Sequence, residues 1–253
     1  MRAVLVLAGK EVRSAFVTPL AYIVCAGFLL LSGFFFFTLL QGFNSHLSQA
    51  ALLRDDCPNL NQWVVLPFLH ALELTLLFLV PILTMRSVAE EKQQGTFELL
   101  VTSPITPLQI VLGKFLGVVS VAAVMLLFAF VFPLVLIVFS DPEIWPIFSG
   151  FLALALYTSA FLALGLAVSA CTRSQTIAGV VTLVLLLVFY IIHAPAPKLG
   201  GRLAEVLNYL SPSNHVDLLF RGVITGVDIV YFLSVMLFGL FLAVRALEAQ
   251  DWR

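Results

Sequence analysis

The sequence has few charged residues and almost no cysteine. Its 253 residues include 13 basic and 14 acidic ones, 11% in total. A soluble protein cannot cover its surface with so few charges. A net charge of −1 excludes a nucleic-acid-binding protein that works through a basic surface. The three cysteines, Cys25, Cys57 and Cys171, lie in separate segments and form neither a disulfide framework nor a CxxC metal site.

Catalytic and nucleotide-binding motifs are also missing. Gly113-Lys114 is followed by Phe115, and Leu108 stands where a P-loop needs its first glycine. The sequence contains no HExxH motif, no GxSxG motif and no paired aspartates within its apolar runs. We therefore expect no enzyme activity, cofactor or metal in this chain, so energy for any work must come from a partner or an ion gradient.

Long apolar runs dominate what is present. Hydrophobic residues make up 61% of the chain, against about 45–50% in an average globular protein. About 20 apolar residues cross a bilayer as a helix, whereas membrane strands need about 10 and alternate polar with apolar residues. The sequence predicts an all-α membrane protein, one transmembrane domain over residues 1–253, with six transmembrane helices. They are expected at residues 16–40, 63–85, 108–139, 146–170, 175–192 and 229–244.

The basic residues predict the orientation, because cytoplasmic segments retain an excess of Lys and Arg. With six spans both termini share one side. That side holds Arg2, Lys10, Arg13, Arg86, Lys92, Lys114, Arg173, Arg245 and Arg253, against Arg54, Lys198, Arg202 and Arg221 opposite. Both termini are therefore expected in the cytoplasm. The first span is too long for a cleaved signal peptide and is expected to remain as a signal anchor.

Residues 1–15 have a helical pattern of their own. Arg2, Lys10 and Arg13 fall in one sector at 100° per residue, opposite an apolar face. This predicts a helix in the inner headgroup layer, although the segment could also merely supply positive charge for orientation. Glu11 falls among the apolar positions, which counts against a face that contacts only lipid.

The loop at residues 86–107 carries the most specific pattern. Ser87 with Glu90 predicts one capping box, and Thr106 with Gln109 predicts another. Between them, Gly95 is expected to interrupt the first helix, and Pro104 to end a second short helix that contains residues 96–100. Charged residues therefore surround an apolar cluster of Phe97, Leu99 and Leu100. The cluster suits a docking surface for another protein, or could pack against the membrane ends of spans two and three.

The string MRSVAEEKQQGTFELLVTSPITPLQIVLGK resembles the loop after the second span of type-2 ABC exporter permeases. The pattern E-x-x-x-G-T-x-E-L-L-x-T-x-P is matched by Glu91, Gly95, Thr96, Glu98, Leu99, Leu100, Thr102 and Pro104. The closing stretch from Ser211 to Arg253 is similar to the gliding-motility and copper-maturation permease branches.

This resemblance implies a transmembrane permease subunit in a bacterial inner membrane. It implies pairing with a second copy or a related permease, and with a separate ATP-binding subunit that carries ATP and Mg. An external accessory protein is a further candidate partner. The loop then corresponds to a coupling helix, and the amphipathic start to an interfacial connecting helix. The coupling residues would be Glu90, Glu91, Gly95, Thr96, Phe97, Glu98, Leu99 and Leu100.

Two ionisable residues lie inside the second predicted span. His70 and Glu73 share one helix face at i and i+3, and such groups usually face a bundle interior or a wet cavity. They could stabilise a helix interface, line a translocation path, or handle a metal ion or protons. Candidate metal ligands on the predicted outer side have no compact spacing, and solvated loops are the default. These are His46, Asp55, Asp56, Cys57, His193 and His215.

The predicted outer segment at residues 194–228 contains two short helices. Leu203, Val206, Leu207 and Leu210 indicate an amphipathic helix, Ser211-Pro212 ends it, and a second follows at residues 215–220. Asp228 is expected to cap the sixth span. The pair suits either an external gate, which the resemblance implies here, or an immobile surface lid.

The function that these patterns predict is export by alternating access, driven by ATP hydrolysis in a partner subunit. One alternative is an ion-coupled secondary transporter that uses Glu73 and His70. Another is a non-transporting mechanical transmitter or anchor for an ATPase. The aromatic and aliphatic interior is compatible with lipids, drugs, glycans and peptides alike.

Overall fold

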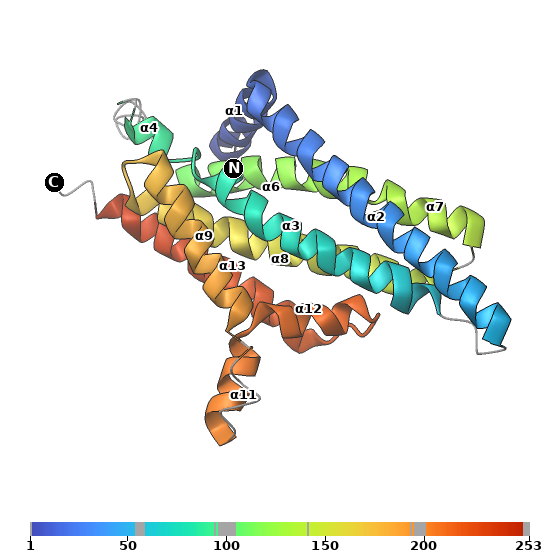
Figure 1. Cartoon of the computed structure of the whole chain (residues 1–253). Helices are drawn as coiled ribbons and strands as arrows, with labels where there is room; N and C mark the ends of the chain where they lie inside the picture. Colours follow the sequence, from blue (N-terminus) through green and yellow to red (C-terminus); the bar gives the residue numbers. More distant parts are fainter. Residues whose placement is uncertain are drawn as a thin grey trace.

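The structure is a computed structural model that describes residues 2–53, 59–93, 95, 105–140, 142–192, 194 and 201–249. Every regular element in these ranges is a helix, which confirms the all-α prediction (Figure 1). The elements are α1 (Arg2–Val17), α2 (Pro19–Leu53), the π-helix η1 (Asn61–Val65), α3 (Leu66–Thr84), α4 (Ala89–Gln93), α6 (Pro107–Ala129), α7 (Val131–Ser140), α8 (Ile144–Cys171), α9 (Gln175–Ile191), α11 (Gly201–Leu210), α12 (Pro212–Phe220) and α13 (Gly226–Glu248).

Five stretches in the described chain are long and apolar enough to cross a membrane. They are Ala21–Ser48, Asn61–Gln93, Pro107–Ser140, Ile144–Cys171 and Gly226–Glu248. The fifth predicted span coincides with α9, an apolar helix of 17 residues. At 1.5 Å per residue α9 is about 26 Å long, at the lower limit for a hydrocarbon layer of about 30 Å. The multi-pass membrane class is therefore confirmed, with five long helices and one short one.

Prolines set two helix boundaries that differ from the predicted spans. The first span was expected from residue 16, but α1 runs to Val17 and α2 begins at Pro19, whose ring removes the N–H that would continue α1. The third span was expected as one helix, but it is divided at Phe130 into α6 and α7. Pro133 causes this break, since it cannot donate to the carbonyl of Ala129.

Helix α8 lies at the centre of the bundle and contacts α3, α6, α9, α12 and α13. Small residues permit these close approaches, as is common between membrane helices. An added Cβ at Gly239 of α13 would lie 2.7 Å from the backbone carbon of Ala163 on α8. Gly150 and Gly165 of α8 likewise face side chains of α3, namely Leu69 and Thr84.

The two ends of the bundle carry different elements. Helices α1 and α4 and the C-terminal end of α13 lie at one end, whereas α11 and α12 lie at the other (Figure 1). The two short helices predicted between spans five and six are thus confirmed. The predicted cap of span six was wrong: Thr225 is the N-cap of α13, and Asp228 lies in its first turn, where it accepts a hydrogen bond from the Thr225 hydroxyl.

Candidate functional site at the junction of α1, α4 and α6

The predicted coupling residues lie partly in and partly outside the described chain. Glu90 and Glu91 lie in α4, and Gly95 follows the helix with a φ of 73°. This left-handed conformation favours glycine and ends α4, as the sequence indicated. The other predicted coupling residues lie outside the described residues, and their role stays a prediction. They are Thr96, Phe97, Glu98, Leu99 and Leu100.

Another helix, not the predicted capping box, provides the cap of α4. Ser87 Oγ makes no hydrogen bond with any described residue, so the Ser87–Glu90 box was wrong. Instead, Ser169 Oγ of α8 accepts hydrogen bonds from the backbone N–H groups of Val88 (3.2 Å) and Ala89 (3.1 Å). The Lys92 ammonium also donates to the backbone carbonyl of Ala170. Helix α4 is therefore fastened at both ends to the C-terminal turns of α8.

The second predicted box is confirmed. Thr106 Oγ1 accepts from the Gln109 backbone N–H at 3.4 Å, and the Gln109 side chain accepts from the Thr106 N–H at 3.3 Å. Helix α6 therefore begins at Pro107, directly after Thr106.

A buried lysine joins α6 to α1 and α4. The Lys114 side chain is 1% exposed, and its Nζ lies 2.8 Å from Glu11 Oε1 and 2.8 Å from Glu91 Oε2. It also donates to the backbone carbonyl of Ser87 at 2.6 Å. The three acceptors belong to α1, to α4 and to the turn before α4. One ammonium group therefore holds three chain segments together.

Two glycines allow α1 to approach α6. An added Cβ at Gly113 would lie 2.7 Å from Leu7 Cδ2, and one at Gly117 would lie 2.5 Å from Glu11 Cβ. These small residues, four apart, form a shallow groove in which α1 packs. The position of Glu11 among apolar residues is explained, because its carboxylate turns toward Lys114 instead of lipid.

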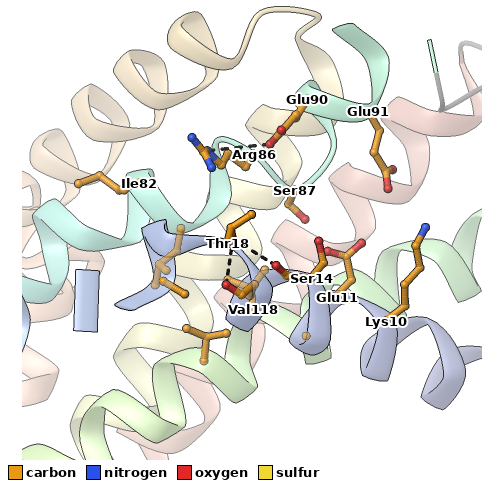
Figure 2. Close-up of a pocket in the computed structure, with 15 residues that line it drawn as sticks. Lys10, Glu11, Ser14, Thr18, Ile82, Arg86, Ser87, Glu90, Glu91 and Val118 are labelled. Carbon is orange, nitrogen blue, oxygen red and sulfur yellow. Dashed lines mark hydrogen bonds and ion pairs between the residues drawn. The ribbon is translucent and has the colours of Figure 1, made fainter. Parts of the chain in front are cut away.

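A cavity of about 380 Å³ adjoins this junction. It is lined by α1, the start of α2, the last turn of α3, the turn before α4, α4 itself and α6. Figure 2 shows Glu11 and Ser14 of α1 facing Ser87 and Glu91 across it. Its charged walls belong to the same elements that Lys114 connects.

The predicted pair in α3 forms part of a longer network. His70 Nδ1 lies 3.2 Å from Glu73 Oε2, and His70 Nε2 lies 3.3 Å from Asp217 Oδ1 of α12. The fully buried Glu73 also accepts a hydrogen bond from Ser213 Oγ at 3.2 Å, and Arg221 Nε pairs with Asp217 at 2.9 Å. The network thus runs from a buried carboxylate to an exposed arginine and ties α3 to α12.

The candidate metal ligands do not come together within the described residues, where no group of three His, Cys, Asp or Glu side chains has ligand geometry. His215 is buried and contacts Asp228 (Nδ1–Oδ1 2.6 Å) and the Tyr209 carbonyl (Nε2–O 2.9 Å), so it joins α11, α12 and α13. His46 packs against Trp63, with ring centroids 4.2 Å apart and the ring planes tilted by 45°. The remaining candidates, Asp55, Asp56, Cys57 and His193, lie outside the described residues.

Sequence reasoning missed Lys114 and Ser169 as parts of the site. Lys114 was considered as a cytoplasmic charge and as a P-loop lysine, but not as a buried cation, although a cation inside an apolar run needs a buried counter-charge. Lys114 inside an apolar run and Glu11 on the apolar face of residues 1–15 are opposite charges in apolar surroundings. The two together could have indicated a buried ion pair. Ser169 gave no signal, since a serine within an apolar helix usually bonds its own backbone.

Comparison with known families identifies the family of the chain. The sequence profile described as ABC-2 family transporter protein matches residues 5–251. No individually curated protein matches the chain. The chain therefore belongs to the ABC-2 transporter family, which confirms the resemblance to type-2 ABC permease subunits. Members of this family work with an ATP-binding subunit.

Proposed function

We propose that this ABC-2 family member is the membrane subunit of an ATP-driven exporter. It would have six spans, with α9 as the fifth, and both termini in the cytoplasm of a bacterial cell. A partner subunit would bind ATP and Mg and dock on α4 and on the residues that follow it, up to Leu100. Two copies of the chain would form the complex and alternate access to a path between them.

The Lys114 junction is the observation that carries this proposal. A displacement of α4 can move the membrane-spanning helices only if α4 is held to them by stable contacts. Lys114 links α4 to α6 and α1, while Ser169 and Lys92 link α4 to α8. A docked subunit that displaced α4 would therefore move the ends of two spans and of the helix preceding α2.

The arrangement of elements supports the proposed orientation. Helices α1 and α4 and the C-terminal end of α13 share one end of the bundle (Figure 1). These elements carry basic residues that cytoplasmic segments are expected to retain, among them Lys10, Arg13, Lys92 and Arg245. An ATP-binding subunit would then reach α4 from the cytoplasm.

The first test is purification of the tagged chain in mild detergent from its native membrane. An ATP-binding subunit should copurify, and the chain alone should not hydrolyse ATP. If the chain is purified repeatedly without such a subunit, the proposal fails.

The second test measures coupling without knowledge of the substrate. In a variant without the native cysteines, Leu218, which is exposed on α12, is replaced by a cysteine that carries a spin label. Trapping with ATP and vanadate should change the distance between the labels of the two copies. Glu91→Gln and Glu98→Lys should abolish this change while the complex stays assembled. Glu248→Gln is the matched control, because among the described residues Glu248 pairs only with Arg245 of its own helix. A full distance change in Glu91→Gln would contradict transmission through Lys114.

The network of Glu73, His70 and Asp217 favours one second candidate, a secondary transporter driven by protons. Linked ionisable groups that extend from a buried site to a surface are typical of proton paths. In that case a pH gradient would drive transport in vesicles that lack any ATPase, and Glu73→Gln would abolish it. Transport that requires the ATP-binding subunit would exclude this candidate.

A further inference from the structure

The cavity beside the Lys114 junction has two chemically different halves. Its polar half is lined by Lys10, Glu11, Ser14, Arg86, Ser87, Glu90 and Glu91. Its apolar half is lined by Ala15, Ala21, Ile82, Leu83, Val118 and Val121. The cavity lies where α1 meets the start of α2, the last turn of α3 and the middle of α6. Because its α2 and α3 walls are the ends of apolar helices, it is at the level expected for lipid headgroups. A ligand that fills both halves has to be amphiphilic.

The charges around the polar half balance. Lys10, Arg86 and the adjacent Lys114 supply three positive charges. Glu11, Glu90 and Glu91 supply three negative ones. An anionic headgroup would add an uncompensated charge to this set, whereas a zwitterionic one would not. Cations and carboxylates lie close enough together to serve both ends of such a headgroup.

Two buried polar atoms in this half lack a hydrogen bond within the described chain. They are Ser87 Oγ, in a residue that is 6% exposed, and Arg86 Nε. Arg86 Nε lies 3.9 Å from Glu90 Oε2, beyond hydrogen-bond distance. Both residues line the cavity, and Figure 2 shows the Ser87 hydroxyl directed toward it. Buried donors without partners are uncommon, and a bound acceptor group such as a phosphate would satisfy them.

We propose that this cavity binds a zwitterionic phospholipid whose headgroup is a phosphate ester of an alcohol that carries a primary amine. The phosphate would accept hydrogen bonds from Arg86 and Ser87, with Lys10 nearby. The ammonium group would lie against Glu90. An acyl chain would follow Ile82, Val118 and Val121 into the bilayer. The apolar half favours a lipid over free phosphoethanolamine, because a soluble ligand would leave this half in contact with water.

Such a lipid would contact both α1 and the turn before α4, and would thus form part of the Lys114 junction. Its binding does not depend on ATP or on a partner subunit. The proposed orientation decides only which leaflet supplies the lipid. The test can therefore fail or succeed independently of the proposed function.

The experiment uses the purified full-length chain in vesicles that contain a photoactivatable phosphatidylethanolamine, with a matched phosphatidylglycerol probe in parallel. Mass spectrometry of the cross-linked peptides should place the first probe at residues 82–91 and 117–121, with labelling roughly tenfold above that of the second probe. Equal labelling by the two headgroups, or none in these segments, would overturn the proposal.

Two variants test the two halves of the cavity. Val118→Trp fills the apolar half, and Arg86→Gln removes the charged one of the two proposed phosphate donors. Each should lower the specific labelling roughly tenfold. Leu116→Trp is the matched control, because Leu116 is on the same helix, is 39% exposed and does not line the cavity. Unchanged labelling in the partly exposed Arg86→Gln variant would contradict the assignment even if Val118→Trp failed to fold.

Competition with soluble phosphoethanolamine distinguishes a lipid headgroup from a free phosphate ester as the ligand. At millimolar concentration phosphoethanolamine should leave the labelling by the lipid probe unchanged. Complete displacement of the lipid would identify a site for a soluble phosphate ester and refute the lipid assignment.

Discussion

An ammonium group has three N–H donors, and at Lys114 each has an acceptor in the structure. They are the carboxylates of Glu11 and Glu91 and the carbonyl of Ser87. Removing a charge from water costs several kcal/mol, and good geometry with full hydrogen bonding is needed to offset that cost. The pairing is therefore more important for fixing the positions of α1 and α4 than for adding net stability.

Lys114→Met should destabilise the chain by about 3–5 kcal/mol, because it leaves two carboxylates close together without their cation. The measurement is the thermal midpoint of the detergent-solubilised protein, followed by size-exclusion chromatography with fluorescence detection. The triple variant Lys114→Met, Glu11→Gln, Glu91→Gln should recover most of the loss, because no unpaired charge remains. If the triple variant is as unstable as the single one, the pairing does not explain the effect.

At the scale of elements, α4 shows how a short helix is held by its neighbours. A helix of five residues is not stable alone, since nucleation fixes several residues for each hydrogen bond gained. Ser169 replaces the missing cap, and Lys92 bonds the end of α8. The stability of α4 therefore depends on its contacts with α8 as much as on its own sequence.

Ser169→Ala should loosen α4 while the rest of the bundle stays folded. The two N–H groups of Val88 and Ala89 would lose their acceptor, at about 1–3 kcal/mol for each buried donor left unsatisfied. Hydrogen exchange at residues 88–93 should become faster by roughly tenfold or more.

Ser149→Ala is the matched control on the same helix. Ser149 is also buried, but in the part of the chain that the structure describes it bonds only carbonyls of its own helix, those of Trp145 and Pro146. It should leave exchange at residues 88–93 unchanged. Equal effects of the two variants would show that Ser169 has no particular role in holding α4.

The predictions from sequence succeeded where the interacting residues are close in the chain. Apolar runs located the long helices, and the Thr106–Gln109 box depends on residues three apart. The prediction for Ser87 failed because the acceptor for α4 comes from Ser169, about 80 residues away. Glu11 and Lys114 are 103 residues apart, and only the packing of α1 on α6 brings them together. The His70–Glu73 pair was visible from its spacing, but its continuation to Asp217 was not.

At the scale of the whole molecule, the helices alternate in direction, so that segments far apart in the sequence share an end. Helices α1 and α4 meet at one end of the bundle, and α11 and α12 occupy the other (Figure 1). Because a helix that spans the membrane separates its two ends by the full hydrocarbon layer, α4 and α11 should be on opposite sides. This holds only if α9, despite its 17 residues, crosses the bilayer.

Labelling of single cysteines tests this arrangement. Gln93→Cys on α4 and Glu205→Cys on α11 are exposed positions in a background without Cys25, Cys57 and Cys171. In right-side-out vesicles a membrane-impermeant maleimide should label Glu205→Cys only, and in inverted vesicles Gln93→Cys only. Labelling of both positions from the same side would mean that α9 does not span the bilayer, which leaves five crossings and separates the two termini. Labelling of Gln93→Cys from the outer face alone would place α4 beyond reach of any cytoplasmic ATP-binding subunit.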